Sequence, residues 1–260
     1  MDAKKEIKHP ANDGIRLASF LHDGIKVCIV FPHGLGDVVM FYPVLEKLRR
    51  DYPKCLIHIM TKPGLEDLDD HDENITYDLS FWLDYAVATA ANEGFTKNTL
   101  CCFQELGIQP PLDDRPKAPK GFPSPWVGVG CTTISMPSYR PTAYECEQIN
   151  KGILDAGMIP LDVSFQTGDH TFEGPSPMAV DTRKVRGSYK MLAGVIERCN
   201  AFIGTFTGSF HVAQALLPDR TLLICPRPSE WKRLFKREPL CINQRDITAK
   251  AITDWLKSLP

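Results

Sequence analysis

Short runs of apolar, often β-branched residues alternate with longer amphipathic segments along most of this 260-residue chain. The short runs predict strands at Lys26–Phe31, Leu56–Met60, Trp126–Gly130, Asp162–Gln166, Ala201–Gly204 and Thr221–Cys225. The amphipathic segments predict helices at Asp37–Asp51, Leu79–Asn92, Thr96–Leu106, Pro141–Ala156, Ser188–Cys199 and Gly208–Leu216, and a closing helix. Such alternation is typical of parallel sheets covered by helices on both faces, so we expect an α/β fold.

A proline-rich stretch divides the chain. Residues Gly107–Pro125 carry six prolines and little apolar content, which indicates a linker between two lobes. We expect Rossmann-like lobes at residues 1–118 and 119–245, followed by a helix over residues 246–260. That helix carries an apolar stripe from Ile247 to Leu259, and we expect it to pack across both lobes. Inside the first predicted helix, Pro43 is expected to interrupt the helix.

Composition and charge narrow the class of protein. The net charge of −2 gives the whole molecule no electrostatic attraction to nucleic acid or to an anionic membrane. The nine cysteines form no C-x-x-C pair and lie mostly in apolar runs, which predicts reduced core residues rather than disulfides or a zinc site. The charged start of the chain does not look like a secretory signal, and no apolar run approaches the roughly 20 residues that span a bilayer. We therefore expect a cytoplasmic protein.

The segment His33-Gly34-Leu35-Gly36-Asp37 joins the first predicted strand to the first predicted helix. A turn with two glycines leaves backbone N–H groups free at the helix start, and an acidic side chain there can face a ligand. Asp37 is therefore a candidate general base for an incoming hydroxyl, a role worth about 10²–10⁴ in rate. The alternative is that Asp37 is only the N-cap of the helix.

A second junction of strand, glycine and helix follows Ala201–Gly204. Thr207-Gly208-Ser209 is a candidate diphosphate cradle, because a helix N-terminus carries partial positive charge and glycine lets the backbone approach phosphate oxygens. The alternative is a capped turn without a ligand. His211 lies one turn later beside an apolar run, where a packed structural histidine is the commoner outcome.

Basic residues in two further places are candidates for binding. Arg140 ends the loop after the strand Val127–Gly130, at the edge of the sheet where ligands bind in open α/β folds, and its guanidinium could pair with a phosphate. A surface arginine is the alternative. A basic and aromatic cluster over residues 227–237 suits a nucleic-acid backbone, a nucleotide-sugar or a solvated rim, and the rim is favoured.

In combination these segments resemble glycosyltransferase family 9, the ADP-heptose:lipopolysaccharide heptosyltransferases and their relatives. The resemblance covers residues 25–235. Its motifs are Gly34-Leu35-Gly36-Asp37 with Pro43 and Leu48–Pro53, then Val127–Arg140 with Pro141, then Val195–Gly204 leading into Thr207–Ala213, followed by Pro226 and Trp231. It implies a GT-B fold, with two Rossmann-like lobes facing a central cleft and an inverting, metal-independent sugar transfer. The N-terminal lobe would hold the acceptor and the C-terminal lobe the nucleotide-sugar.

The resemblance also assigns roles. Asp37 would be the general base in an acceptor-side loop formed by His33, Gly34 and Gly36. Arg140, Thr207, Gly208, Ser209 and His211 would bind the donor diphosphate, with no metal and no cofactor. The family has an acidic residue directly before its Ser/Thr-Gly pair, and this chain has Phe206 there, so the sugar contact of that carboxylate is lost.

We therefore expect a glycosyltransferase that moves a sugar, a hexose or heptose, from a nucleotide-diphosphate sugar to an acceptor hydroxyl, by analogy a saccharide. One alternative is a phage-type enzyme acting on a hydroxylated DNA base. Another is a nucleotide-binding module without catalysis, which Phe206 would mark. An NAD-dependent oxidoreductase is disfavoured because the first turn reads G-x-G-D and not G-x-G-x-x-G.

Overall fold

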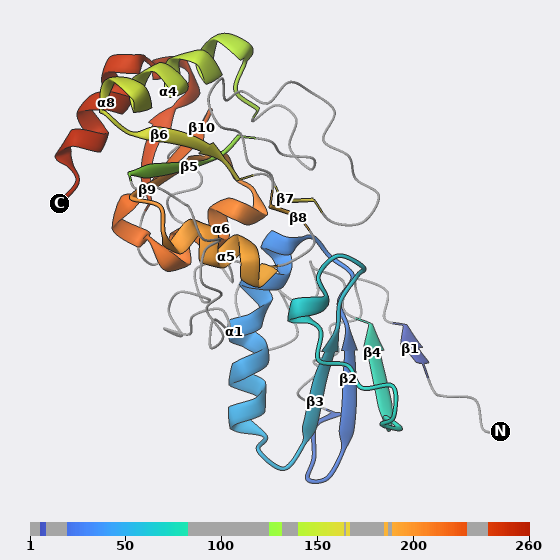
Figure 1. Cartoon of the computed structure of the whole chain (residues 1–260). Coiled ribbons are helices and arrows are strands. Elements are labelled where there is room, and N and C mark those ends of the chain that lie inside the picture. The colour runs from blue at the N-terminus through green and yellow to red at the C-terminus, as the bar shows by residue number, and fades with distance from the viewer. Residues whose placement is uncertain are drawn as a thin grey trace. The chain divides into compact units, whose positions relative to one another are not determined.

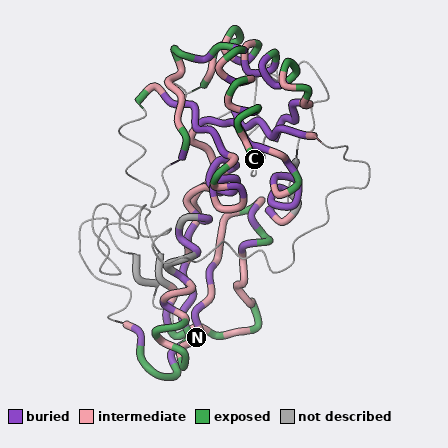
Figure 2. The backbone as a smooth tube through the Cα atoms, turned by 90° about the vertical axis from the view of Figure 1, so that its left-hand side faces the viewer, coloured by how far each residue is buried: buried purple, intermediate pink, exposed green. Residues whose placement is uncertain are grey.

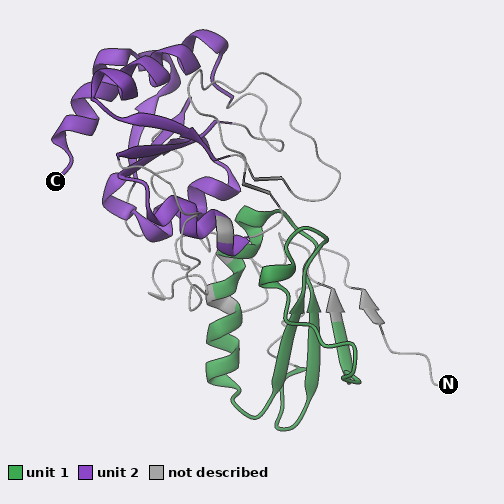
Figure 3. Ribbon diagram, in the orientation of Figure 1, with its two compact units in different colours: residues 1–111, 234–236 green, residues 112–233, 237–260 purple. Residues whose placement is uncertain are grey.

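The computed structural model describes residues 6–8, 20–82, 125–131, 140–163, 165–166, 185–186, 189–227 and 239–260. The chain divides into two compact units, shown in Figure 3: unit 1 comprises residues 1–111 and 234–236, and unit 2 comprises residues 112–233 and 237–260. The predicted linker up to residue 124, the predicted helix over 96–106 and residues 228–237 of the basic cluster lie outside the described residues.

Unit 1 contains one parallel sheet with strand order β1-β4-β2-β3. Its elements are β1 (Glu6–Lys8), β2 (Lys26–Val30), α1 (Leu35–Asp51), β3 (Leu56–Met60), the 3₁₀ turn η2 (Glu66–Leu68) and β4 (Leu79–Trp82). The helix α1 crosses from β2 to β3 and buries an apolar stripe that includes Val38, Leu45 and Leu48. It continues through residue 43, so the predicted interruption is wrong; burial of the stripe on both sides of that residue stabilises the helix despite one lost hydrogen bond.

The start of the predicted helix Leu79–Asn92 is a strand. Residues Leu79–Trp82 form β4, which pairs with β1 on one side and with β2 on the other. The Lys26 backbone N–H donates to the Asp78 carboxylate at 2.9 Å and fixes where this ladder begins. Leu79 and Trp82 have helical spacing, but pairing with two neighbouring strands outweighs that local preference. Residues 83–92 are outside the described part of the chain.

Unit 2 contains a five-stranded parallel sheet with strand order β11-β10-β9-β5-β6. Its elements are β5 (Trp126–Gly130), α4 (Ala143–Asp155), β6 (Ile159–Asp162), β7 (Phe165–Gln166), β8 (Val185–Arg186), α5 (Tyr189–Glu197), β9 (Ala201–Gly204), α6 (Gly208–Leu216), η4 (Pro218–Arg220), β10 (Thr221–Cys225), β11 (Leu240–Asn243), η5 (Gln244–Asp246) and α8 (Ala249–Ser258). The helices α4 and α8 cover one face of the sheet, and α5 and α6 cover the other (Figure 1). The three inner strands β5, β9 and β10 are buried along their whole length, as strands covered on both faces must be (Figure 2).

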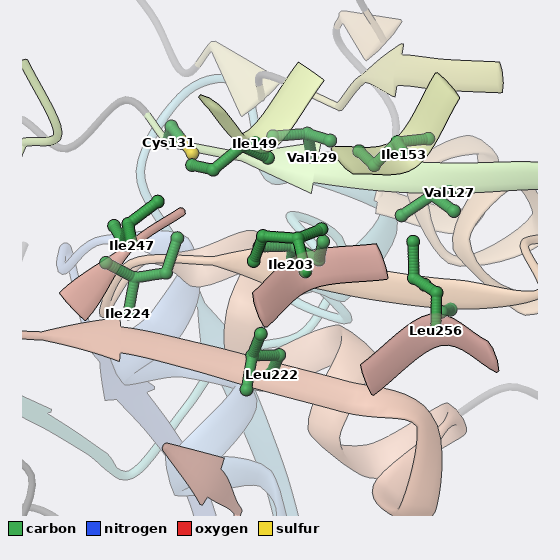
Figure 4. Packing of buried hydrophobic residues seen from close by; sticks show 12 residues of the cluster. Val127, Val129, Cys131, Ile149, Ile153, Ile203, Leu222, Ile224, Ile247 and Leu256 are labelled. Atoms are coloured by element: carbon green, nitrogen blue, oxygen red, sulfur yellow. The ribbon is translucent and has the colours of Figure 1, made fainter. Parts of the chain in front are cut away.

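The core under α4 and α8 is built from alternate residues of the strands. Val127, Val129, Ile203 and Ile224 point toward these helices and meet their apolar side chains (Figure 4). A glycine allows the two helices to approach closely, because a Cβ at Gly152 would lie 2.6 Å from a backbone oxygen of α8. The closing helix therefore packs on α4 within unit 2. Its predicted contact with both lobes stays a prediction.

Two strand predictions in unit 2 need correction. The predicted strand Asp162–Gln166 is two elements, β6 ending at Asp162 and the short β7, which belongs to a separate two-stranded sheet with β8. Pro160 argues against a strand that begins earlier, but β6 lies at the sheet edge, where a missing N–H is tolerated. The strand β11 was not predicted; it is four residues long, pairs with β10 and lies at the edge of the sheet, where its residues are at most half-buried.

Candidate functional site

The strand order of the unit 2 sheet reverses between β5 and β9. In chain order the strands β5, β6, β9, β10 and β11 are arranged 2-1-3-4-5, and in such sheets ligands bind outside the carboxyl ends of the two strands where the order reverses. Gly130 ends β5 and Gly204 ends β9, and the Thr205 N–H donates to the Gly130 carbonyl at 3.0 Å. The connection that carries Arg140 and the loop Thr207-Gly208-Ser209 therefore begin at neighbouring strand ends.

Gly130 and Gly204, at the carboxyl ends of β5 and β9, leave space for the ring of Phe202. A Cβ at Gly130 would lie 2.8 Å from Cζ of Phe202, and a Cβ at Gly204 would lie 2.7 Å from Cε1 of the same ring and 2.8 Å from the Gly130 carbonyl oxygen. Phe202 is completely buried. The close approach of β5 and β9, which sets the spacing of the two connections, thus depends on the absence of side chains at these positions.

The N-terminus of α6 is capped by one side chain and has open backbone donors. Thr207 is the N-cap, and its Oγ1 accepts a hydrogen bond from the Phe210 N–H at 3.3 Å, which leaves the hydroxyl proton for another acceptor. The Ser209 hydroxyl is buried and donates to the Val163 carbonyl at 3.1 Å. The group of Ser209 that could donate to a phosphate is therefore its backbone N–H. Within the described residues, the N–H groups of Gly208 and Ser209 have no acceptor, and the first turn contains no acidic side chain.

The N-terminus of α4 differs from that of α6 because its own side chains occupy it. Thr142 and Glu145 form a capping box, in which the Glu145 carboxylate accepts the Thr142 N–H and the Thr142 hydroxyl accepts the Glu145 N–H. Gln244 donates to the same carboxylate at 3.0 Å and to the Arg140 carbonyl at 3.1 Å. These bonds fix the backbone of Arg140 while its side chain is exposed, so the guanidinium remains a candidate phosphate partner.

His211 is a packed residue of α6. Its side chain is only 7% exposed, and burial lowers its pKa to about 4, so the imidazole is neutral near pH 7. The half-buried Phe206 ring meets it edge to face at 4.8 Å. The role of His211 at a diphosphate stays a prediction. Phe206 presents a ring where the family resemblance would place a carboxylate.

Unit 1 places Asp37 in the first turn of α1. The helix begins at Leu35 with Gly34 as its N-cap, so both the predicted start at Asp37 and the alternative that Asp37 is the N-cap are wrong. From the third helical position the Asp37 carboxylate reaches back and accepts the Gly34 N–H at 3.1 Å. A Cβ at Gly34 would lie 3.2 Å from this carboxylate oxygen, so glycine permits the contact. The His33 ring packs against buried Phe31 with ring centroids 4.5 Å apart.

The environment of Asp37 suits a proton acceptor. Burial raises the pKa of this carboxyl above its ordinary value, and the Gly34 N–H, His33 and Lys62 oppose the rise. A carboxylate with a raised pKa holds a proton more strongly and is therefore a better general base. Asp37 therefore contributes to the cap of α1, and its carboxyl has a raised pKa.

Lys62 is a residue that the sequence interpretation missed. It follows β3, whose end lies beside that of β2 because the Phe31 N–H donates to the Met60 carbonyl at 2.8 Å. The Lys62 carbonyl accepts the Leu65 N–H at 3.3 Å across a turn in which Gly64 has φ +91°, a conformation that favours glycine. The Lys-Pro-Gly string after a predicted strand was the available signal for a cation near Asp37.

Known proteins match this chain in structure and not in sequence. No family model matches the chain, and no curated protein matches it in sequence. Among the described residues, no three His, Cys, Asp or Glu side chains gather as a metal site, and no helix has the length and apolar character to cross a bilayer.

Several solved structures share the fold. The iron-containing dodecameric glycosyltransferase TibC from enterotoxigenic E. coli superposes with a TM-score of 0.64 and 13% identity over 85% of this chain and 63% of TibC, so the chain spans less than two thirds of that protein. TibC has also been solved in complex with ADP-D-β-D-heptose. E. coli ADP-heptose lipopolysaccharide heptosyltransferase II gives 0.60 and 15% over 90% of this chain and 98% of that chain. A family 9 glycosyltransferase from Veillonella parvula gives 0.54 and 14% over 92% and 98%.

At these identities the likeness shows the fold alone. Both units have the predicted parallel sheets, and the solved structures described above include a heptosyltransferase and a family 9 glycosyltransferase, the proteins that the sequence motifs resemble. The predicted fold class is therefore confirmed: the chain has the α/β fold of the GT-B glycosyltransferases.

Proposed function

We propose that this chain is a glycosyltransferase that moves a sugar, a hexose or heptose, from a nucleotide-diphosphate sugar to an acceptor hydroxyl, with a saccharide as the acceptor. The observation that carries the proposal is the N-terminus of α6. It lies where the strand order reverses, presents two N–H groups without an acceptor among the described residues, and has no acidic side chain in its first turn. TibC, which shares the fold, binds ADP-heptose.

The donor diphosphate would be held by unit 2. The Gly208 and Ser209 N–H groups and the Thr207 hydroxyl would donate to its oxygens, and Arg140 would pair with its charge. Preorganised donors of this kind stabilise the negative charge that grows on the diphosphate as the sugar leaves. Phe206 offers the sugar a ring face and no hydrogen bond, so the donor sugar differs from one that needs a carboxylate contact there.

Asp37 would be the general base. Its carboxylate takes the proton of the acceptor hydroxyl while that oxygen attacks the anomeric carbon and the bond from this carbon to the diphosphate oxygen breaks. The products are the glycosylated acceptor and a nucleoside diphosphate, and attack opposite to the leaving group inverts the anomeric centre. We include transfer without metal or cofactor in the proposal, and a cytoplasmic location, which agrees with the free thiols of all seven described cysteines.

Donor binding tests the unit 2 site. A thermal-shift screen with UDP-, GDP-, ADP-, CMP- and dTDP-sugars should find one that raises Tm, because a ligand at 100 times its Kd stabilises the folded protein by about 2.7 kcal/mol. Gly208→Asp should abolish this shift while preserving the helix, since an acidic residue is favourable at a helix start. Gly208→Asn has the same size without the charge and should keep most of the shift. Loss of the shift in both variants, or in neither, contradicts a diphosphate at this helix.

Measuring turnover distinguishes an enzyme from a nucleotide-binding module without catalysis. The presence of Phe206 in place of an acidic residue favours the binding module. A donor that binds should be converted when acceptor saccharides are supplied, and slow release of nucleoside diphosphate should occur without them. The anomeric configuration of the product tests inversion, and unchanged turnover after exhaustive chelation tests metal independence. Binding without transfer or hydrolysis for every donor would establish the binding module instead.

A further inference from the structure

The side chain of Gln244 joins two segments of unit 2 that are 104 residues apart in the sequence. Its Nε2 donates to the Arg140 carbonyl at 3.1 Å and to the Glu145 carboxylate at 3.0 Å. An amide nitrogen carries two protons, so it can make both bonds at the same time. Gln244 therefore connects η5, which lies between β11 and α8, with the segment that leads into α4.

The turn that presents Gln244 is held on both sides. Asn243 is the N-cap of η5: its Oδ1 accepts the Arg245 N–H at 3.0 Å, and its Nδ2 donates to the Pro226 carbonyl at 3.2 Å, just after β10. On the other side, the Ile247 N–H donates to the Gln244 carbonyl at 3.4 Å, and the Ile247 side chain is buried in the core under α4 and α8. The position of the Gln244 backbone is thus set by the sheet and by the core.

The backbone of Arg140 is restricted from several directions. Pro141 confines the residue before it to extended conformations, and the Thr142 N–H is bound to the Glu145 carboxylate. The bond from Gln244 then fixes the orientation of the Arg140 carbonyl. Because the carbonyl and the side chain leave the same Cα, this bond also limits the direction in which the exposed side chain projects.

We propose that Gln244 is a positioning residue of the donor site: it holds Arg140 so that the guanidinium can pair with a diphosphate at the N-terminus of α6. The inference rests on the proposed function, which assigns the diphosphate to Arg140 and to the α6 donors. Gln244 does not touch the donor and acts through Arg140 alone. Without its bonds the segment before α4 gains freedom that it loses again on binding, so the affinity for a diphosphate falls while the α6 donors stay in place.

Inorganic pyrophosphate is the probe, because it carries the charge of a diphosphate without a base or a sugar. It is titrated by calorimetry into the whole chain at low ionic strength. Gln244→Met keeps the length of the side chain and removes both bonds, and it should raise the Kd about 2–10-fold, the factor that corresponds to ordering one long side chain. Gln244→Glu is a second variant that cannot donate and places a carboxylate beside that of Glu145, so it should weaken binding at least as much.

A double-mutant cycle distinguishes positioning from a general loss of structure. Arg140→Ala should weaken binding about tenfold or more, because it removes a charged partner, and Gln244→Met should have no further effect on the Kd in that background. The matched control is Gln148→Met. Gln148 also joins α4 to the C-terminal segment, since its Oε1 accepts the Ala249 N–H at 3.1 Å, but it holds the start of α8 and not Arg140. This variant should lower Tm and leave the Kd unchanged.

The outcomes separate a failure of this inference from a failure of the proposed function. If the wild type does not bind pyrophosphate, or if Gly208→Asp leaves the binding intact, the diphosphate site at α6 is wrong and the role of Gln244 falls with it. If the wild type binds at α6 and both Gln244 variants bind equally well, only the role of Gln244 is overturned. The same follows if Gln244→Met weakens binding as much in the Arg140→Ala background as in the wild type.

Discussion

Gly130→Ala is expected to destabilise unit 2 through contact with a single side chain. The added Cβ would lie 2.8 Å from Cζ of Phe202, and its next neighbour is the Ser209 Cβ at 3.5 Å. Because the ring is fully buried, it cannot rotate into solvent, and overpacking of this kind costs about 1–3 kcal/mol. Replacing a strand glycine by alanine recovers about 0.5–1 kcal/mol of backbone entropy. The net loss should be about 0–2.5 kcal/mol, with the strain at the Phe202 ring.

Phe202→Leu should rescue this variant. Leucine lacks the distal ring carbon that the alanine Cβ meets, so the methyl group fills part of the space that the ring vacates. The two substitutions should therefore be non-additive, with a favourable coupling of about 1 kcal/mol or more in a double-mutant cycle. The assay is chemical unfolding of the wild type, both single variants and the double variant, analysed for the transition of unit 2.

Gly204→Ala provides the control for this cycle. Its Cβ would also meet Phe202, at 2.7 Å, but a second obstacle at 2.8 Å is the Gly130 carbonyl oxygen, which belongs to the backbone of β5. Phe202→Leu removes only the first obstacle and should rescue Gly204→Ala much less. Additive free energies in the Gly130 cycle, or equal rescue at both glycines, would refute this account of how β5 and β9 approach each other.

Three further predictions concern the caps and the helix contact. The pKa of Asp37 is raised above its unfolded value of 3.8, so the folded state loses stability as the pH rises from about 4 through the raised value. Asp37→Asn should remove this loss, which would flatten that part of the plot of Tm against pH. At pH 7 the variant should be at least as stable as the wild type. Thr207→Ala removes the cap of α6 and should lower the free energy of unfolding, measured with denaturant, by about 1 kcal/mol. Thr207→Ser keeps the capping hydroxyl and should lower it little. Equal losses of stability in the two variants would contradict the cap. Gly152→Val should detach α8 from α4, because a Cβ at this position would lie within 2.7 Å of atoms of Ala249 and Ile252. Limited proteolysis should then cleave the C-terminal helix faster than in the wild type. Lys151→Ala, on the exposed face of α4, should leave the cleavage rate unchanged.

Local pattern predicted two strands that are buried along their whole length, one edge strand in which buried and half-buried residues alternate, and the helix that has a clear cap. Leu56–Met60, Ala201–Gly204, Thr221–Cys225 and Gly208–Leu216 have the bounds that the sequence indicates. The secondary-structure predictions failed where pairing with a strand that is distant in the sequence determines the local structure. The segment Leu79–Trp82 is a strand because β1 and β2 pair with it, and the four-residue β11 is a strand because it pairs with β10.

The candidate site shows the same division. The sequence identified Asp37 and the Thr207-Gly208-Ser209 loop, because glycine and a capping residue at a helix start are local signals. It did not show that the Ser209 hydroxyl is bound to Val163, since that residue is 46 positions away. Nor did it show the reversal of strand order between β5 and β9, which depends on pairing across the sheet and which places the α6 N-terminus at a binding edge.

The proposed role of Asp37 in sugar transfer is tested most directly by acceptor-dependent release of nucleoside diphosphate from the donor that the binding screen identifies. Asp37→Asn should keep donor binding and lose about 10²–10⁴-fold in turnover, because the amide keeps the shape of the side chain and cannot accept the proton. Asp51→Asn, at the exposed far end of the same helix, should turn over like the wild type. Wild-type turnover by Asp37→Asn, or an equal loss in Asp51→Asn, would contradict a general base at this position.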